Sequence, residues 1–259
     1  MAGSLPEVRV GARGAARVRS LHPWVFRGDL ASEPSASNGD LVRVVSEQGR
    51  LLGYAFYSAL SKIALRLFSL QEDPPEESFW VARVEDALRH RDRVVQDTDA
   101  CRLLFGESDG VPGLVVDRYG PHLVIQALTA GAERSLDPVL TLLQERTEVQ
   151  SVLARNDPSV RELEGLKREV VQLRGRTPER IEVREGPVRY LVDPWNGQKT
   201  GAFLDQRENR QTAAGYSRGR VLDVFTYHGS FALHAAAGAT EVEAVDCLPE
   251  ALSRGRENA

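Results

Sequence analysis

Three short runs of apolar and β-branched residues stand out near the front of the chain: LVRVV at 41–45, LLGYAFY at 51–57 and IALRLF at 63–68. Glycine, asparagine and serine turn residues separate them, a pattern typical of β-strands. The pattern predicts a small β-barrel. The acidic segment QEDPPEES at 71–78 follows, and its paired prolines cannot continue a ladder, so it predicts a linker.

The middle of the chain mixes helical and strand periods. Apolar residues at near-helical spacing predict one amphipathic helix over 78–96. The stretch 113–130 predicts a hairpin that turns at Gly120-Pro121, and a helix over 133–146 and a strand over 151–155 follow it. The middle of the chain is therefore expected to be an α+β unit.

After this unit the order of the predicted elements changes. RIEVREGPVRYLVDP at 180–194 predicts a hairpin around Glu185-Gly186-Pro187. A β-α-β-α series comes next and favours a parallel, doubly wound sheet. Its expected elements are a helix at 204–217, a strand at 221–225, a helix at 230–237, a strand at 242–246 and a helix from Pro249. Two strands leave such a sheet with open edges, so we expect that the sequence stops inside this domain.

Composition narrows the class of protein. A length of 259 residues suits two or three compact units. The sequence has no apolar run of about eighteen residues and no signal-peptide core, which predicts a cytoplasmic protein without membrane partners. Cys101 and Cys247 lack CxxC spacing and the five histidines are scattered, so no disulfide framework and no metal site are expected.

Charge is unevenly distributed. The net charge is −4, yet residues 1–70 carry nine Lys and Arg against five Asp and Glu. Such a basic end suits nucleic-acid binding, and a solvated surface explains it equally well. Trp24 in HPWVF is open to two interpretations, a residue that stacks on RNA or an aromatic of the barrel core.

The segment 221–246 carries the strongest chemical signal. A buried strand bears Asp223, a loop with Gly229 leads into a helix, and the second strand ends at Asp246, where an acid reaches ribose hydroxyls. Phe225 and Tyr227 replace the early glycines that a dinucleotide site requires. The loop therefore suits a nucleoside ligand without a diphosphate, such as S-adenosylmethionine; the alternative is a structural βαβ turn.

The polar segment GQKTGAFLDQRENR at 197–210 precedes that strand. In one interpretation Asp205 caps a helix, with Glu208 completing a capping box. That account leaves the remaining polar residues unexplained. A cofactor-lid or RNA-facing role is the alternative for Gln198, Lys199, Thr200, Gln206 and Arg207.

The sequence resembles the PUA-domain-containing methyltransferases of large-subunit ribosomal RNA that make 5-methylcytidine, over essentially its whole length. The motifs that carry the resemblance are HPWVFRGDL (22–30), ESDGVPGLVVDRYG (107–120), RNDPSVRELEGL (155–166), GQKTGAFLDQR (197–207) and VLDVFTYHGSFAL (221–233). The resemblance implies a multi-domain α+β and α/β protein. Its expected parts are an RNA-docking PUA barrel (1–72), a central α+β domain (73–185) and the start of a Rossmann-like class I methyltransferase fold (186–259).

The resemblance also implies a set of site residues for S-adenosylmethionine. The chain departs from the family at His228 and Ser230, where threonine and glycine are expected. The implied partner is large-subunit ribosomal RNA, with a homodimer as a further expectation. The implied cofactor residues are Gln198, Lys199, Thr200, Asp205, Gln206, Arg207, Asp223, Phe225, Tyr227, Gly229, Ser230 and Asp246.

Methylation of cytosine C5 requires a cysteine thiolate that first adds to C6. In the family that cysteine lies on a later strand-loop, beyond Ala259, so no catalytic residue is expected within the chain. Cys101 and Cys247 are expected to be ordinary small packing residues. A related guanine methyltransferase and a non-catalytic RNA-binding protein are the alternatives. A nicotinamide-dependent oxidoreductase is disfavoured because the glycine fingerprint is absent.

Overall fold

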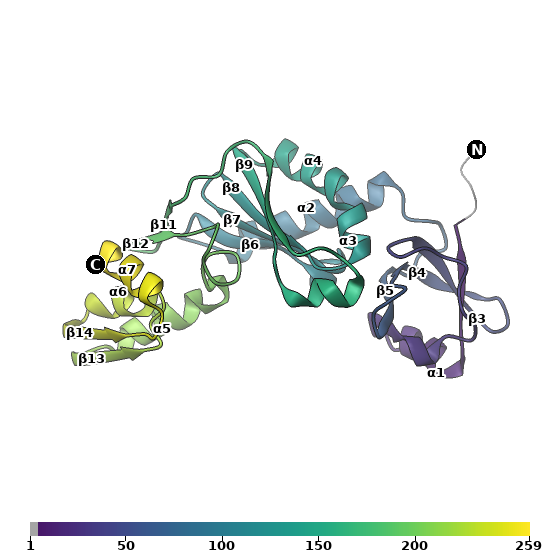
Figure 1. The fold of residues 1–259 in the computed structure, drawn as a ribbon, viewed down its shortest axis with the longest axis horizontal. Coiled ribbons are helices and arrows are strands. Elements are labelled where there is room, and N and C mark those ends of the chain that lie inside the picture. Colours follow the sequence, from purple (N-terminus) through teal and green to yellow (C-terminus); the bar gives the residue numbers. More distant parts are fainter. Residues whose placement is uncertain (1–4) are drawn as a thin grey trace.

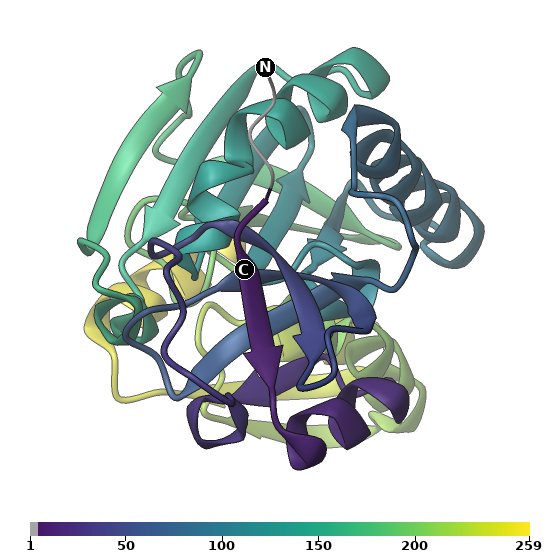
Figure 2. The same ribbon diagram turned by 90° about the vertical axis from the view of Figure 1, so that its right-hand side faces the viewer.

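The computed structural model describes residues 5–259, so residues 1–4 of the predicted first domain lie outside the described part. Three units follow one another along the long axis of the molecule, in the order of the sequence (Figure 1). Figure 2 looks along this row with the N-terminal sheet in front and the central sheet behind it.

The N-terminal unit is a five-stranded sheet in the order β1-β3-β4-β5-β2. Its elements are β1 (Glu7–Val10), α1 (Ala12–Arg19), β2 (Trp24–Phe26), β3 (Leu41–Ser46), β4 (Leu51–Tyr57) and β5 (Ile63–Ser69). The three predicted strands are confirmed as β3, β4 and β5. Among residues 5–70, one isolated bridge, Val10 to Leu30, adds to these ladders, and the predicted barrel is not confirmed.

The central unit is a second five-stranded sheet, in the order β10-β9-β8-β7-β6. Helices α2 and α4 pack on one of its faces through a buried apolar cluster. The predicted helix 78–96 and the hairpin around Gly120 are confirmed as α2 and β7–β8. The elements are α2 (Glu77–Val94), β6 (Ala100–Phe105), β7 (Leu114–Tyr119), β8 (His122–Ala127), α3 (Ala130–Arg134), α4 (Leu136–Arg146), β9 (Ser151–Asn156) and β10 (Glu169–Arg174).

The predicted helix 133–146 is instead two helices, α3 and α4, which meet at Ser135. Pro138 lies in the first turn of α4, where its missing N–H removes no helical hydrogen bond. The same proline inside one continuous helix would clash with the carbonyl of residue 134, so the helix ends and restarts.

The C-terminal unit begins with the predicted hairpin, β11 (Ile181–Glu185) and β12 (Val188–Val192), which straddles the predicted domain limit at 185. The predicted series is confirmed, and β13 pairs with β14 in parallel. The predicted domain limits themselves stay a prediction. The remaining elements are α5 (Arg207–Tyr216), β13 (Gly219–Val224), α6 (Ser230–Ala236), β14 (Ala239–Val245) and α7 (Pro249–Asn258).

Specific contacts join the N-terminal and central units. The indole Nε1 of Trp24 donates to Glu107 Oε1 at 2.8 Å, and Trp24 is half-buried at this contact, outside the core of its own unit. The rings of Phe56 and Trp80 stack with centroids 6.0 Å apart. A Cβ built on Gly131 would lie 2.3 Å from the Phe56 ring, so the close approach of α3 requires glycine there. These contacts fix the two units against each other.

Candidate cofactor site

Two acids lie at the carboxyl ends of the neighbouring parallel strands β13 and β14. Asp223 precedes the last residue of β13, and Asp246 follows Val245, the last residue of β14. In open α/β sheets, ligands bind outside this end of the strands. The structure therefore places Asp223 and Asp246 at the same edge of the sheet, at the carboxyl ends of β13 and β14.

The loop between β13 and α6 has an unusual backbone. Phe225 and Tyr227 have positive φ angles of 64° and 55°, and Gly229 has 84°. The left-handed region costs a non-glycine residue roughly 1 kcal/mol or more and persists only where the surroundings hold it. Such strain is concentrated at binding sites, which favours a ligand-binding loop over a plain βαβ turn.

The two acids hold this loop. Asp223 Oδ2 accepts hydrogen bonds from Thr226 Oγ1 at 2.5 Å and from the backbone N–H of Ala232 at 3.1 Å. Among the described residues, no donor reaches its other oxygen, Oδ1. Asp223 thus ties the strand to the first turns of α6 and keeps one oxygen for a further donor.

Asp246 holds the loop from the other side. Its Oδ2 accepts from the backbone N–H of Tyr227 at 2.8 Å, and its Oδ1 accepts from the N–H of Leu248 at 2.9 Å. The amide of Leu248, followed by that of Tyr227, lowers the pKa of Asp246 below its usual range. The side chain therefore stays a carboxylate, and each oxygen retains a lone pair that can accept a hydroxyl.

The two aromatic residues of the loop point in opposite directions. The Phe225 side chain is 83% exposed, whereas Tyr227 is 7% exposed. The Tyr227 hydroxyl accepts from the backbone N–H of Gln198 at 2.7 Å, and burial is the main cause of its raised pKa. A Cβ on Gly197 would lie 2.9 Å from that hydroxyl. Tyr227 therefore braces the loop against segment 197–201, and only its backbone faces the two acids.

Segment 197–207 is held mainly by the central sheet. Thr200 is fully buried, and its hydroxyl donates to Asp117 Oδ2 at 2.6 Å and lies 2.8 Å from the Tyr119 hydroxyl. Arg102 forms a bidentate ion pair with the same Asp117. Thr200 accordingly faces the central unit and acts as an anchor of this segment.

Four other predicted residues of this segment, Lys199, Asp205, Gln206 and Arg207, pair with residues close to them in the sequence. Lys199 Nζ donates to Asp205 Oδ1 at 2.8 Å, Gln206 lies 3.4 Å from the same carboxylate, and Arg207 pairs with Glu208. Burial raises the pKa of Asp205, but the hydrogen bond and charge of Lys199 outweigh it and lower the pKa overall. The capping interpretation is wrong, because Gln206 is the N-cap of α5 and makes no side-chain cap.

Sequence reasoning missed a buried charge cluster beneath the site. Glu185 and Arg210 are each 1% exposed and form a bidentate pair at 2.7 and 2.6 Å. Tyr190 donates to Glu185 Oε2 at 3.1 Å, and His234 Nε2 lies 3.3 Å from Oε1. The sequence indicated little of this cluster, because its members come from separate elements. Arg210 is the buried residue of α5.

His228 and Ser230, the two departures from the family pattern, are both buried. His228 stacks on Tyr190 with ring centroids 5.1 Å apart, and burial lowers its pKa to about 4. Neither ring nitrogen has a partner among the described residues. His228 is thus a neutral packing residue of the loop, and Ser230 begins α6.

Neither cysteine is placed as an activated nucleophile. Cys101 is buried in β6, and burial raises the pKa of its thiol, so it is protonated at neutral pH. Cys247 is exposed, directly after Asp246. The described residues hold no cluster of three or more His, Cys, Asp or Glu that suits a metal ion. Among residues 5–259 no helix is long and apolar enough to cross a membrane.

Two family models match the chain. Residues 8–70 match the PUA-like domain, and residues 158–259 match the S-adenosylmethionine-dependent methyltransferase. Together with the observed topology, these matches give the chain an N-terminal PUA-like domain and a methyltransferase-like α/β fold. The second match begins before the predicted limit at 186.

Curated relatives are named ribosomal RNA large subunit methyltransferase I. The Aeromonas hydrophila protein is 39% identical over 246 residues, and the Erwinia tasmaniensis protein is 40% identical over 244 residues. Each match covers 92% of this chain and 62% of the relative. The chain therefore spans less than two thirds of the length of these relatives.

Solved structures share the fold. A Streptococcus mutans protein, a candidate SAM-dependent methyltransferase, is 21% identical with a TM-score of 0.81, over 97% of this chain and 66% of its own. A candidate methyltransferase solved in complex with SAH has a TM-score of 0.83 at 20% identity, over 97% of this chain and 65% of its own. At about 20% identity, the similarity to these two structures shows a shared fold.

Proposed function

We propose that this chain acts in the S-adenosylmethionine-dependent methylation of large-subunit ribosomal RNA, in the cytoplasm. The observation that carries the proposal is the pair Asp223 and Asp246, which hold a strained loop at the carboxyl ends of two parallel strands. The relatives named above support the RNA substrate. The chain spans 62% of the length of these relatives, and we propose that it shares their activity.

The residues present suit the cofactor. Asp246 is placed to accept the ribose hydroxyls, and Oδ1 of Asp223 to accept from the ammonium group of the methionine part. The exposed ring of Phe225 offers a face for the adenine. When bound, the cofactor supplies an electrophilic methyl group on sulfur. The chain contributes a fixed carboxylate geometry that the hydrogen bonds of the two acids and Tyr227 maintain.

We assign RNA docking to the PUA-like domain. The proposed domains are the PUA-like domain (1–72), the central domain (73–185) and the methyltransferase-like domain (186–259). Six of the nine basic residues in the PUA-like domain form ion pairs: Arg9, Arg13, Arg17, Arg27, Arg43 and Arg66. The docking charge would therefore come mainly from Arg19, Arg50 and Lys62. A barrel and a homodimer remain part of the proposal.

We further propose 5-methylcytidine as the product, following the resemblance. That reaction requires a thiolate, and we assign this role to neither Cys101 nor Cys247. The match of residues 8–70 to the PUA-like domain also favours a second candidate, an RNA-binding role of this chain without catalysis. A guanine-methylating activity would need no cysteine and is the remaining alternative.

Calorimetric titration with S-adenosylmethionine and S-adenosylhomocysteine tests the cofactor assignment. We expect saturable binding of both, weakened about tenfold or more by Asp246→Ala, since about 1.4 kcal/mol corresponds to tenfold. Glu243→Ala removes an exposed acid of β14 and is the matched control. Equal affinity of Asp246→Ala and the wild type would refute the site. Binding of ribosomal RNA without methyl transfer would favour the second candidate.

A further inference from the structure

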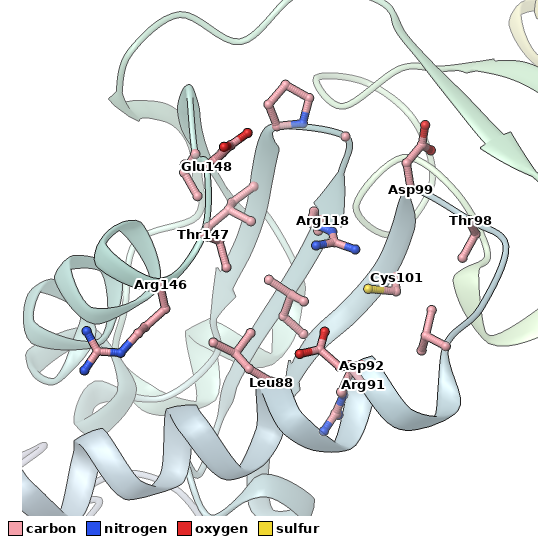
Figure 3. Close-up of a pocket in the computed structure, with 16 residues that line it drawn as sticks. Leu88, Arg91, Asp92, Thr98, Asp99, Cys101, Arg118, Arg146, Thr147 and Glu148 are labelled. Atoms are coloured by element: carbon pink, nitrogen blue, oxygen red, sulfur yellow. The ribbon is translucent and has the colours of Figure 1, made fainter.

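The central unit contains a cavity that the cofactor site does not use. It has a volume of about 560 Å³ and opens at the end of the sheet where α2 and α4 end (Figure 3). No residue of β13, β14 or the loop between β13 and α6 lines it. Its volume lies in the range of small-molecule sites. Its apolar floor comes from Leu88, Val95, Leu103, Leu123 and Val149.

Arg118 is the exceptional residue of this cavity. It lies on β7 directly opposite Cys101 of β6, and its side chain lines the cavity (Figure 3). Within residues 5–259 its guanidinium has no hydrogen bond or ion pair, and its Nε is shielded from solvent. The two other arginines of the lining are paired, Arg91 with Asp109 at 2.6 and 2.7 Å and Arg146 with Glu85 at 3.1 Å. A shielded N–H without an acceptor costs free energy, so an occupant that accepts from Arg118 Nε would be favoured.

Asp92 presents the complementary charge from α2. It also lines the cavity and pairs with no cation in the described part of the chain. Arg118 and Asp92 do not form a salt bridge with each other, so their charged atoms are more than 4.0 Å apart. An occupant that accepts hydrogen bonds on one edge and donates them on another would satisfy both.

The charges that line the cavity disfavour an anionic occupant. Arg91 and Arg146 are neutralised by acids outside the lining. The charges that remain in the lining are one cation, Arg118, and three carboxylates, those of Asp92, Asp99 and Glu148. The C-terminal ends of α2 and α4 add partial negative charge, which disfavours a phosphate. Arg118 requires a hydrogen-bond acceptor and the carboxylates require a donor. A molecule that offers both on its edges and an apolar face to the floor suits this lining.

We propose that this cavity binds one unpaired nucleobase of an RNA substrate. Acceptor atoms on one edge of the base meet Arg118, an exocyclic amine or ring N–H meets Asp92, and the ring lies on the apolar floor. The proposal rests on the proposed function, because it assumes that the chain handles RNA. It adds a second point of RNA contact in the central unit, between the PUA-like domain and the cofactor site.

Binding of small probes tests the cavity directly. We would titrate the full chain with the four nucleoside 5′-monophosphates, with ribose 5-phosphate as the base-free probe and with L-leucine as a zwitterionic probe. We expect saturable binding of at least one nucleotide, weakened about tenfold by Arg118→Ala, and no Arg118-dependent binding of ribose 5-phosphate. Arg189→Ala, an exposed arginine of β12, is the matched control and should change nothing.

Two further variants protect this test against a folding defect. Arg118→Lys keeps the charge but loses the planar fork, so it should also weaken nucleotide binding. Asp92→Asn lies at the exposed end of α2 and should change which base binds best. Arg118-dependent binding of L-leucine would overturn the proposal in favour of an amino-acid site. Absence of binding of any nucleotide would also overturn it.

The salt dependence of RNA binding separates a base contact from a phosphate contact. A base contact predicts that Arg118→Ala weakens the binding of a short single-stranded RNA about tenfold without changing the salt slope. A slope reduced by about one unit would show a phosphate contact and reject the proposal. Calorimetry with S-adenosylmethionine on the same preparation tests the proposed function separately. If the chain bound nucleotides but not S-adenosylmethionine, the cofactor site would be rejected and the nucleobase site would not.

Discussion

The hydroxyl of Tyr227 accepts a hydrogen bond from the backbone N–H of Gln198, 2.7 Å away. This bond links two segments that the sequence separates by a helix and a strand, and Tyr227 Oη also lies 3.4 Å from the carbonyl of Gly201. The loop between β13 and α6 and the segment 197–201 are therefore held together as one structural unit.

Tyr227→Phe removes this link and leaves the Gln198 N–H without its acceptor. We expect a loss of about 1–3 kcal/mol in the free energy of unfolding, because a part-buried donor is left unpaired. We also expect weaker S-adenosylmethionine binding, because the strained loop loses its brace. Urea denaturation and calorimetry measure the two effects. Tyr216→Phe, at a side chain that is 83% exposed, is the control.

Thr200→Val tests the anchor to the central sheet. Valine keeps the shape of threonine but leaves Asp117 with one donor fewer in a buried site. We expect a destabilisation of about 1–3 kcal/mol, whereas Thr200→Ser should restore most of it because it keeps the hydroxyl. Equal stability of the valine and serine variants in denaturant titrations would contradict this account.

Glu185→Gln tests the buried charge cluster. Arg210 would then be a buried cation without its counter-ion, and we expect a loss of about 3–5 kcal/mol. The double variant Glu185→Leu/Arg210→Met removes both charges and should be clearly more stable than the single variant. Thermal or urea unfolding measures both. A double variant as unstable as Glu185→Gln would argue that the ion pair itself is indispensable.

His228 predicts a specific pH dependence. Its folded-state pKa of about 4 lies below the ordinary value of 6.5, so between these pH values the unfolded chain binds the proton more tightly. The contribution is complete above pH 6.5 and is lost as the pH falls towards 4. The difference amounts to roughly 3 kcal/mol. His228→Phe should lose less stability over this range than the wild type, and equal losses in denaturant titrations would show that His228 is not involved.

Local signals explain what the sequence predicted well. The hairpins around Gly120 and Gly186 and the alternating β-α series follow from turn residues and periodicity, which act over a few residues. The positions of Asp223 and Asp246 follow from the same pattern, because parallel strands align their carboxyl ends.

The remaining features depend on tertiary contacts. Phe225 and Tyr227 are two residues apart in the same loop, and contacts with residues far away in the sequence, such as Gly197 and Phe203, hold the Tyr227 ring inward. The resemblance implied a cofactor role for Thr200, which stays a prediction, but nothing near Thr200 in the sequence indicated its bond to Asp117, which lies 83 residues earlier. The strands β2 and β6 were missed because they are short or mixed in pattern and are held by non-local pairing.

The contacts between the N-terminal and central units also decide what the connection between them is for. Residues 70–76 are mostly exposed, while the stack of Phe56 on Trp80 and the bond from Trp24 to Glu107 hold the two units in place. The interface contacts therefore set the orientation of the two units, and the connecting segment only raises the effective concentration of one unit near the other. If the chain were severed there, the N-terminal unit could dock in trans in its original orientation.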